Sequence, residues 1–208
     1  MTQPRLLVCG FREFPAAPRN PSAEVIEALA AQAWSPPDVD IEFLALPVSW
    51  TDTVPAVLAA AKARPADGIL VVGVATSADA FRVETLGRNK AARADAQDPE
   101  APGPLIDAGG PGVIAVTAPT EAMLEAIVQT GLAARLSDDA GDYLCNFTLY
   151  SLLVAKAAPE VGFLHVPQAR ECADGALFGL ADVDKAVRAA CTAFAGALSR
   201  PDASRRTA

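Results

Sequence analysis

The only histidine of the chain and one of its four cysteines lie in settings that suit nucleophilic catalysis. Cys145 follows the turn-forming pair Ala140-Gly141 and opens an apolar stretch typical of a helix. The positive end of a helix dipole favours a thiolate, and free backbone N–H groups at a helix start can hold an oxyanion. A cysteine at a helix start is often structural, however, so this position alone does not identify a nucleophile.

His165 lies near the end of an apolar segment, Gly-Phe-Leu-His-Val-Pro, that is typical of a strand. In α/β folds the carboxyl ends of such strands face the ligand crevice. An imidazole titrates near neutrality and can act as a general base toward a thiol. The alternative is a structural core histidine, but a Cys–His enzyme with this sequence has no other histidine to use.

A third polar group should orient the imidazole, and Glu84 is our candidate. It stands in the partly alternating stretch Phe-Arg-Val-Glu-Thr-Leu, and the alternative is a surface glutamate. Phe11 and Phe14 occupy a loop where polar residues are expected. They could form the aromatic walls of a pocket for a small flat ligand, or they could pack beneath the loop.

Short apolar segments that alternate with helical patterns should position these residues. Strands are expected over residues 5–9, 41–46, 68–74, 112–117, 133–136 and 162–166. Helices are expected over residues 21–33, 54–62, 120–130, 145–157 and 183–198. This rhythm predicts one α/β domain over residues 1–200, a three-layer α/β/α sandwich with a mostly parallel or mixed central sheet. We expect a long surface excursion over residues 87–112 and a polar tail over residues 201–208.

Composition and charge exclude several classes of function. The formal net charge is −8, and without a basic cluster this argues against nucleic-acid or anionic-membrane binding. A chain with one histidine and no CxxC pair cannot build a Cys/His zinc site, so we expect no metal. The longest apolar run, residues 68–75, is too short to span a bilayer, and Arg12 and Glu13 interrupt the first apolar segment. We therefore expect a cytoplasmic protein.

Several collinear segments between about residues 5 and 198 resemble the pyroglutamyl peptidase I (pyrrolidone-carboxylate peptidase) family of cysteine peptidases. Residues 139–146, Asp-Ala-Gly-Asp-Tyr-Leu-Cys-Asn, are similar to the nucleophile motif of the family. Residues 162–167, Gly-Phe-Leu-His-Val-Pro, are similar to its base motif. Weaker similarities are found at residues 10–14, 20–22, 46–48, 72–73 and 84–89.

The resemblance implies an enzyme that removes an N-terminal pyroglutamyl residue from peptides without a metal or cofactor. It implies that Cys145 is the nucleophile, that His165 is the general base and that Glu84 orients the base. The oxyanion would be held by backbone N–H groups at Cys145. The family also implies a homo-oligomer, a dimer or a tetramer.

The resemblance implies a further set of substrate-binding residues: Phe11, Phe14, Asn20, Tyr143 and Arg93. In this set, Phe14 and Tyr143 would hold the lactam ring between them. The chain departs from the family there, since Pro15-Ala16 replaces Gly-Gly and Arg93 is one residue off the family spacing. The aspartates at 138, 139 and 142 could oppose a thiolate or point to solvent. Two alternatives therefore stay open: the same chemistry on another N-acyl group, and a non-catalytic relative that binds a ligand or partner.

Overall fold

A mixed six-stranded sheet forms the middle layer of the computed structural model, which describes residues 3–92 and 100–199. In space its strands follow the order β2-β1-β3-β8-β4-β7. β2, β1, β3 and β8 run parallel, whereas β4 is antiparallel to β8 and parallel to β7. The bounds are β1 (Arg5–Phe11), β2 (Asp40–Leu46), β3 (Gly68–Ala75), β4 (Phe81–Glu84), β7 (Ala134–Ser137) and β8 (Glu160–Pro167).

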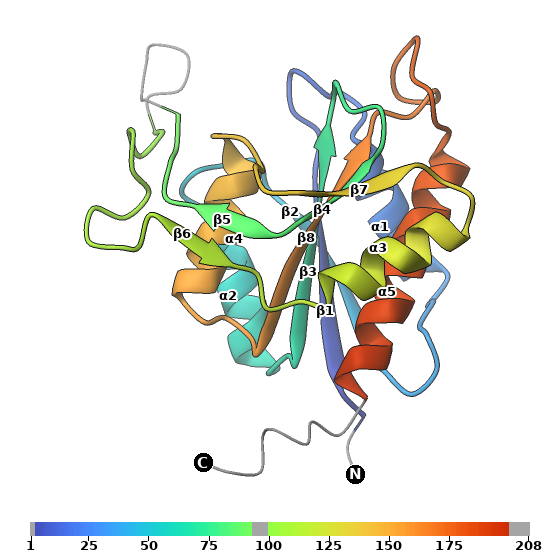
Figure 1. Cartoon of the computed structure of the whole chain (residues 1–208), viewed down its shortest axis with the longest axis horizontal. Coiled ribbons are helices and arrows are strands. Elements are labelled where there is room, and N and C mark those ends of the chain that lie inside the picture. The colour runs from blue at the N-terminus through green and yellow to red at the C-terminus, as the bar shows by residue number, and fades with distance from the viewer. Residues whose placement is uncertain (1–2, 93–99, 200–208) are drawn as a thin grey trace.

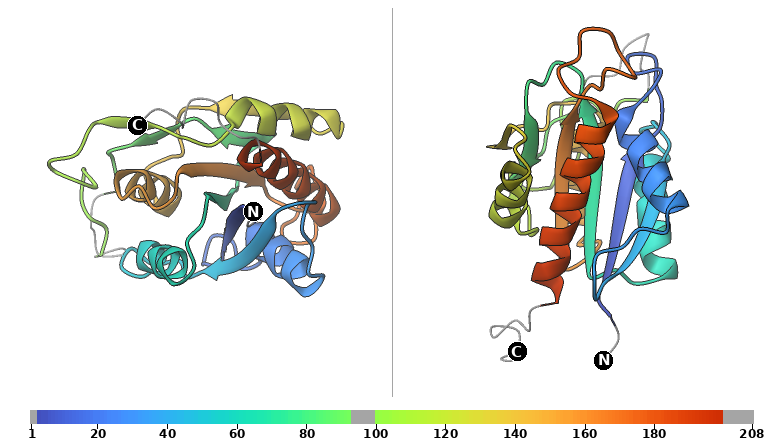
Figure 2. Two further views of the ribbon diagram at one scale, coloured as in Figure 1. Left: turned by 90° about the horizontal axis from the view of Figure 1, so that it is seen from below. Right: turned by 90° about the vertical axis from the view of Figure 1, so that its right-hand side faces the viewer.

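Helices cover both faces of this sheet, which confirms the predicted α/β sandwich (Figures 1 and 2). One face carries α1 (Pro21–Ala31), α3 (Thr120–Gln129) and α5 (Leu180–Leu198), and the other carries α2 (Thr53–Ala63) and α4 (Leu144–Val154). Asn20 caps the start of α1 and Pro21 takes its first helical position, residue types that are favoured at these two places. Within the described ranges, no helix combines the length and apolar character needed to cross a membrane.

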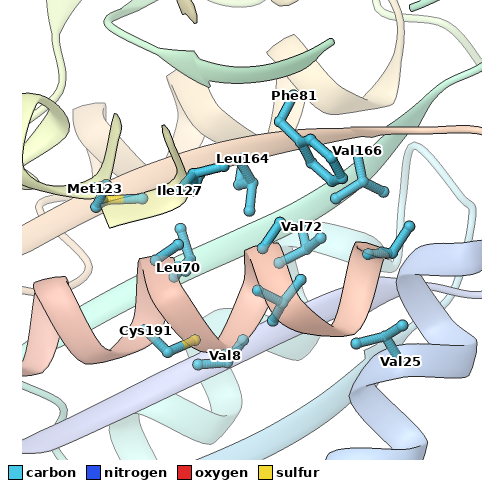
Figure 3. Packing of buried hydrophobic residues seen from close by; sticks show 14 of the residues in the cluster. Val8, Val25, Leu70, Val72, Phe81, Met123, Ile127, Leu164, Val166 and Cys191 are labelled. Carbon is cyan, nitrogen blue, oxygen red and sulfur yellow. The ribbon is translucent and has the colours of Figure 1, made fainter. Parts of the chain in front are cut away.

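Alternate side chains of the central strands build two separate cores. One set packs against α1, α3 and α5 (Figure 3), and includes Val8, Leu70, Val72, Leu164 and Val166. The other set faces α2 and α4, and includes Leu7, Cys9, Ile69, Val71 and Phe163. Strands that are covered on both faces are apolar at nearly every position, which is why β1, β3 and β8 were recognisable in the sequence.

A second, two-stranded ribbon differs from the prediction. The segment predicted as a core strand over residues 112–117 forms β6 (Val113–Ala115), which pairs antiparallel with β5 (Leu86–Arg88) outside the main sheet. α4 lies between this ribbon and β8 (Figure 1). A helix covered from several sides must be apolar nearly all round, which accounts for the composition of α4.

Asn89 holds together the described parts of the predicted surface excursion over residues 87–112 through side-chain hydrogen bonds. The Asn89 side chain donates to the carbonyl oxygen of Asp107 at 2.6 Å and accepts from the N–H groups of Ile106 and Asp107, both at 2.9 Å. The excursion therefore begins as the ribbon strand β5 and returns to it. The predicted site residue Arg93 and the predicted tail over residues 201–208 lie outside the described residues.

Candidate active site

A pocket of about 1100 Å³ opens where the carboxyl ends of β1, β3 and β8 meet the start of α4. Most of the site residues predicted from the sequence line this pocket: Phe11, Phe14, Asn20, Tyr143, Cys145 and His165. Glu84 is fully buried and contacts His165 from behind rather than lining the pocket. The fold thus brings together predicted residues that are far apart in the sequence.

Cys145 is the second residue of α4, and its sulfur lies against the middle of the sheet. No side chain caps the start of α4, so the first backbone N–H groups of the helix are available to an anion. Gly73 of β3 makes room for the sulfur, because a Cβ atom there would lie 3.0 Å from Cys145 Sγ and 2.8 Å from the Phe163 ring. In the sequence Gly73 is part of the Val72-Gly73 pair that resembles the family, but only the fold shows that the missing side chain makes room for the sulfur.

His165 and Glu84 form a buried pair across two antiparallel strands. Arg82 is the direct partner of His165, and Glu84 lies two residues further along β4 on the same face. The His165 Nδ1 atom is 2.8 Å from Glu84 Oε1. This contact leaves Nε2 as the ring nitrogen that can serve Cys145.

The surroundings of His165 raise its pKa from 6.5 to about 9. Burial acts in the opposite direction, because it disfavours the charged imidazolium, but the charge and hydrogen bond of Cys145 and then those of Glu84 outweigh it. The imidazole therefore keeps its proton at neutral pH, between the sulfur and a carboxylate. This is the electrostatic arrangement that a Cys–His nucleophile requires.

Aromatic side chains line the part of the pocket near β1 and the loop that precedes α4. The Phe11 ring is buried and lies 6.5 Å from the Phe163 ring, measured between centroids. Tyr143 is 41% exposed and packs edge-on against Trp50 at 5.2 Å. Phe14 is half-buried at the pocket wall. These rings offer an apolar surface on which a small flat ring can stack.

Two buried asparagines hold the backbone around the pocket. The Asn20 amide donates to the Arg12 carbonyl oxygen at 3.0 Å and accepts from the Ser22 N–H at 3.1 Å, so it shapes the loop that carries Phe14. The Asn146 amide accepts from the Arg88 N–H at 2.9 Å and donates to the carbonyl oxygens of residues 88 and 90, both at 2.8 Å. Asn146 appears in the sequence only as part of the nucleophile motif, and its supporting role becomes visible in the fold.

The three aspartates near Cys145 in the sequence also line the pocket. All three are exposed, and two of them form ion pairs, Asp138 with Arg88 at 3.0 Å and Asp139 with Lys90 at 2.8 Å. The hydrogen bond from Lys90 is the main reason why the pKa of Asp139 is lowered. Over residues 3–92 and 100–199, no group of His, Cys, Asp and Glu side chains is arranged to hold a metal ion.

Comparison with known proteins agrees with this geometry. Residues 4–196 match the family model for pyroglutamyl peptidase. A pyrrolidone-carboxylate peptidase of Clavibacter michiganensis is 30% identical over 181 residues, which cover 83% of this chain and 82% of that protein. One from Streptococcus pyogenes is 28% identical over 214 residues, 97% of each chain.

Solved structures give the same result. Pyroglutamyl peptidase I of Bacillus amyloliquefaciens has a TM-score of 0.83 and 26% identity to this chain, and the match covers 93% of this chain and 97% of that one. The pyrrolidone carboxyl peptidase of Thermococcus litoralis has the same fold, with a TM-score of 0.83 at 21% identity over 94% of each chain. The sequence match, the fold and the geometry of the pocket lead to one conclusion: this chain belongs to the pyroglutamyl peptidase family.

Proposed function

We propose that this protein is a cysteine peptidase that removes an N-terminal pyroglutamyl residue from peptides, with Cys145 as nucleophile and His165 as general acid and base. The observation that carries the proposal is the buried Glu84–His165 pair, 2.8 Å between Oε1 and Nδ1, beside a cysteine at the start of a helix. Membership of the pyroglutamyl peptidase family supports the substrate class. Family membership also favours a peptidase over a non-catalytic protein that only binds a ligand or partner.

In the acylation step the Cys145 thiolate attacks the pyroglutamyl carbonyl carbon and a C–S bond forms. The negative charge that develops on the carbonyl oxygen is stabilised by the uncapped backbone N–H groups at the start of α4. As the C–N bond breaks, the His165 imidazolium gives its proton to the leaving amine. The shortened peptide departs and a thioester remains on Cys145.

In the deacylation step His165 is neutral and takes a proton from a water molecule that attacks the thioester. The C–S bond breaks, free pyroglutamate leaves and the imidazolium–thiolate pair returns. The Glu84 carboxylate holds Nδ1 and stabilises the imidazolium whenever it forms. The lactam ring stacks between Phe14 and Tyr143, while Phe11 and Asn20 support that wall. The family resemblance adds Arg93 to the proposed substrate-binding residues.

Release of a fluorescent amine from pyroglutamyl and prolyl conjugates tests the proposal. Both acyl groups carry a five-membered ring, but only the pyroglutamyl ring has the lactam carbonyl. We expect hydrolysis of the pyroglutamyl conjugate that is lost in Cys145→Ala and His165→Gln and after thiol alkylation. Cys172→Ala is the matched control, since it removes a half-buried thiol outside the pocket. Full activity in Cys145→Ala would rule out the mechanism, and preference for the prolyl conjugate would rule out the substrate class.

The proposal extends to a cytoplasmic homo-oligomer, a dimer or tetramer, in which residues 1–200 act as one domain. Light scattering on the purified protein measures the mass directly, and a monomeric mass at micromolar concentration would contradict the oligomer. Cell fractionation checks the location. Limited proteolysis that leaves one resistant core would support the single domain.

A further inference from the structure

The strand order separates two chemically different ends of the pocket. Along the sheet, Phe11 is on β1, Gly73 and the adjoining Cys145 sulfur are at β3, and His165 is on β8. The next two strands, β4 and β7, contribute Arg82 and Arg135 to the pocket lining. Neighbouring strands are about 4.8 Å apart, so the cationic end lies beyond the base, on the side away from the aromatic wall.

The two arginines point into the same pocket because of their register. Arg82 is the direct partner of His165 in the antiparallel pair, and it is also the partner of Arg135 in the parallel pair of β4 and β7. Directly opposed residues of neighbouring strands project from the same face of a sheet. A guanidinium therefore flanks the imidazole on the side away from Cys145 and the aromatic wall.

Arg82 has no partner that would satisfy its charge within the described parts of the chain. Its Nε atom is buried without a hydrogen-bond partner, and its guanidinium forms no ion pair with residues 3–92 or 100–199. Asp79 forms an ion pair with Arg135, with 2.7 Å between Asp79 Oδ1 and Arg135 Nη2. The pKa of Asp79 is lowered mainly by that hydrogen bond, with a smaller effect from the charge of Arg82.

The other carboxylates of the pocket do not neutralise Arg82 either. Asp138 and Asp139 are paired with Arg88 and Lys90 at the other end of β5. Asp142 is exposed in the loop before α4, and it forms no ion pair with Arg82 within the described ranges. The end of the pocket at β4 and β7 thus has one unmatched positive charge in a protein whose net charge is −8.

We propose that Arg82, with the Arg135–Asp79 pair beside it, binds a carboxylate on the leaving side of the substrate. The inference rests on the proposed function, since it assumes that the acyl ring occupies the aromatic end. It assigns a substrate class: pyroglutamyl compounds whose second residue carries a negative charge, either as the free carboxylate of a dipeptide or as an acidic side chain. A guanidinium binds either carboxylate through charge-assisted hydrogen bonds.

The test compares kcat/KM within two matched substrate pairs at low salt. Pyroglutamyl-alanine against pyroglutamyl-alaninamide isolates the free carboxylate, and pyroglutamyl-glutamyl amide against pyroglutamyl-glutaminyl amide isolates the side-chain carboxylate. Release of the new amino group is followed with an amine-reactive fluorophore. The ratio within a pair is independent of the fraction of folded enzyme, so variants that fold poorly remain informative.

We expect the wild type to prefer the charged member of at least one pair by about tenfold, as for a charge-assisted contact at a partly exposed site. Arg82→Met should bring that ratio close to one, Arg82→Lys should keep part of it, and Arg135→Met should reduce it. Arg188→Met is the control, because Arg188 lies on α5 over the opposite face and pairs with Asp184. High salt should weaken the preference.

Each outcome decides a different point. The pair that shows the preference identifies the source of the carboxylate. Hydrolysis by the wild type without preference in either pair, or a preference unchanged in Arg82→Met, would overturn the carboxylate site and leave the proposed function standing. No hydrolysis of any of the four compounds by the wild type would refute the proposed function and this inference with it.

Discussion

Replacing Glu84 by Gln changes the charge behind the base and little else. The Gln side chain keeps an oxygen that can accept from His165 Nδ1, so the ring orientation can be preserved. The negative charge that helps to raise the pKa of His165 from 6.5 to about 9 is lost. Glu84 Oε2 has no hydrogen-bond partner among the described residues, so the amide nitrogen of Gln replaces an atom that is already unpaired.

The expected effect follows from the sign of this shift. A raised pKa means that the folded protein holds the His165 proton until the pH rises through about 9. In the wild type, the associated stabilisation is fully present below pH 6.5 and is lost as the pH approaches 9; it amounts to about 3 kcal/mol. A buried charge-assisted hydrogen bond contributes up to about 3 kcal/mol, so Glu84→Gln should lower kcat/KM by about a hundredfold at pH 8.

The assay is the pH profile of kcat/KM for a pyroglutamyl amine conjugate. We expect the alkaline limb of the wild type near pH 9, and a limb at least about one pH unit lower in Glu84→Gln. Glu125→Gln, an exposed substitution on α3, is the matched control. A Glu84→Gln enzyme that is folded by circular dichroism and keeps its alkaline limb near pH 9 would refute the reasoning, since Glu84 would then not act on the charge of His165.

Three further predictions use the same structure. Gly73→Ala places a Cβ atom 3.0 Å from Cys145 Sγ and should lower kcat/KM by about a hundredfold. Gly196→Ala is the control, because its added Cβ meets no neighbouring group within 4 Å, and it should leave kcat/KM unchanged. Equal kcat/KM values in the two variants would contradict this prediction. Asn146→Ala removes three hydrogen bonds of a buried amide and should lower the free energy of unfolding in urea by about 3 kcal/mol. The exposed Gln129→Ala should lower it by about 0.5 kcal/mol or less. Iodoacetamide at pH 7.5 should modify Cys145 before the other thiols, as measured by peptide mass mapping. Burial raises the pKa of Cys9 and Cys191, and burial and then Glu24 raise the pKa of Cys172 to about 11. If another thiol were labelled first, the result would be inconsistent with the site.

The sequence predicted well those elements whose burial is complete. β1, β3 and β8 are covered on both faces, so they are apolar at nearly every position, and their limits were predicted to within a few residues. The helix that begins at Pro21 has a capping asparagine directly before it, and the predicted start of this helix is correct. The grouping of Cys145 and His165 in one pocket also followed, because the carboxyl ends of parallel strands and the starts of the following helices meet at one edge of the sheet.

The strand that was missed carries charge, and the strand that was assigned to the wrong sheet lies in the outer ribbon. β4 is four residues long and alternates Phe81 and Val83 with Arg82 and Glu84, which is too short a pattern to distinguish from a loop. β6 is apolar in sequence, but it lies in the ribbon over α4 and two of its three residues are exposed. An apolar composition predicts that a segment is buried on average, but it does not predict which sheet a short strand joins.

The direction of β4 decides how its two charged residues divide their roles. Both project from the face that carries His165, but β4 runs antiparallel to β8, so its first residues lie at the pocket mouth and its last residue lies below. Glu84 is therefore fully buried behind the imidazole, where its charge is strongest, while Arg82 is half-buried at the level of His165 and can reach a ligand. In a parallel strand the order would be reversed, with the carboxylate at the mouth and the guanidinium in the interior. A deep carboxylate stabilises the imidazolium, and a shallow guanidinium attracts an anionic leaving group without competing for the same proton.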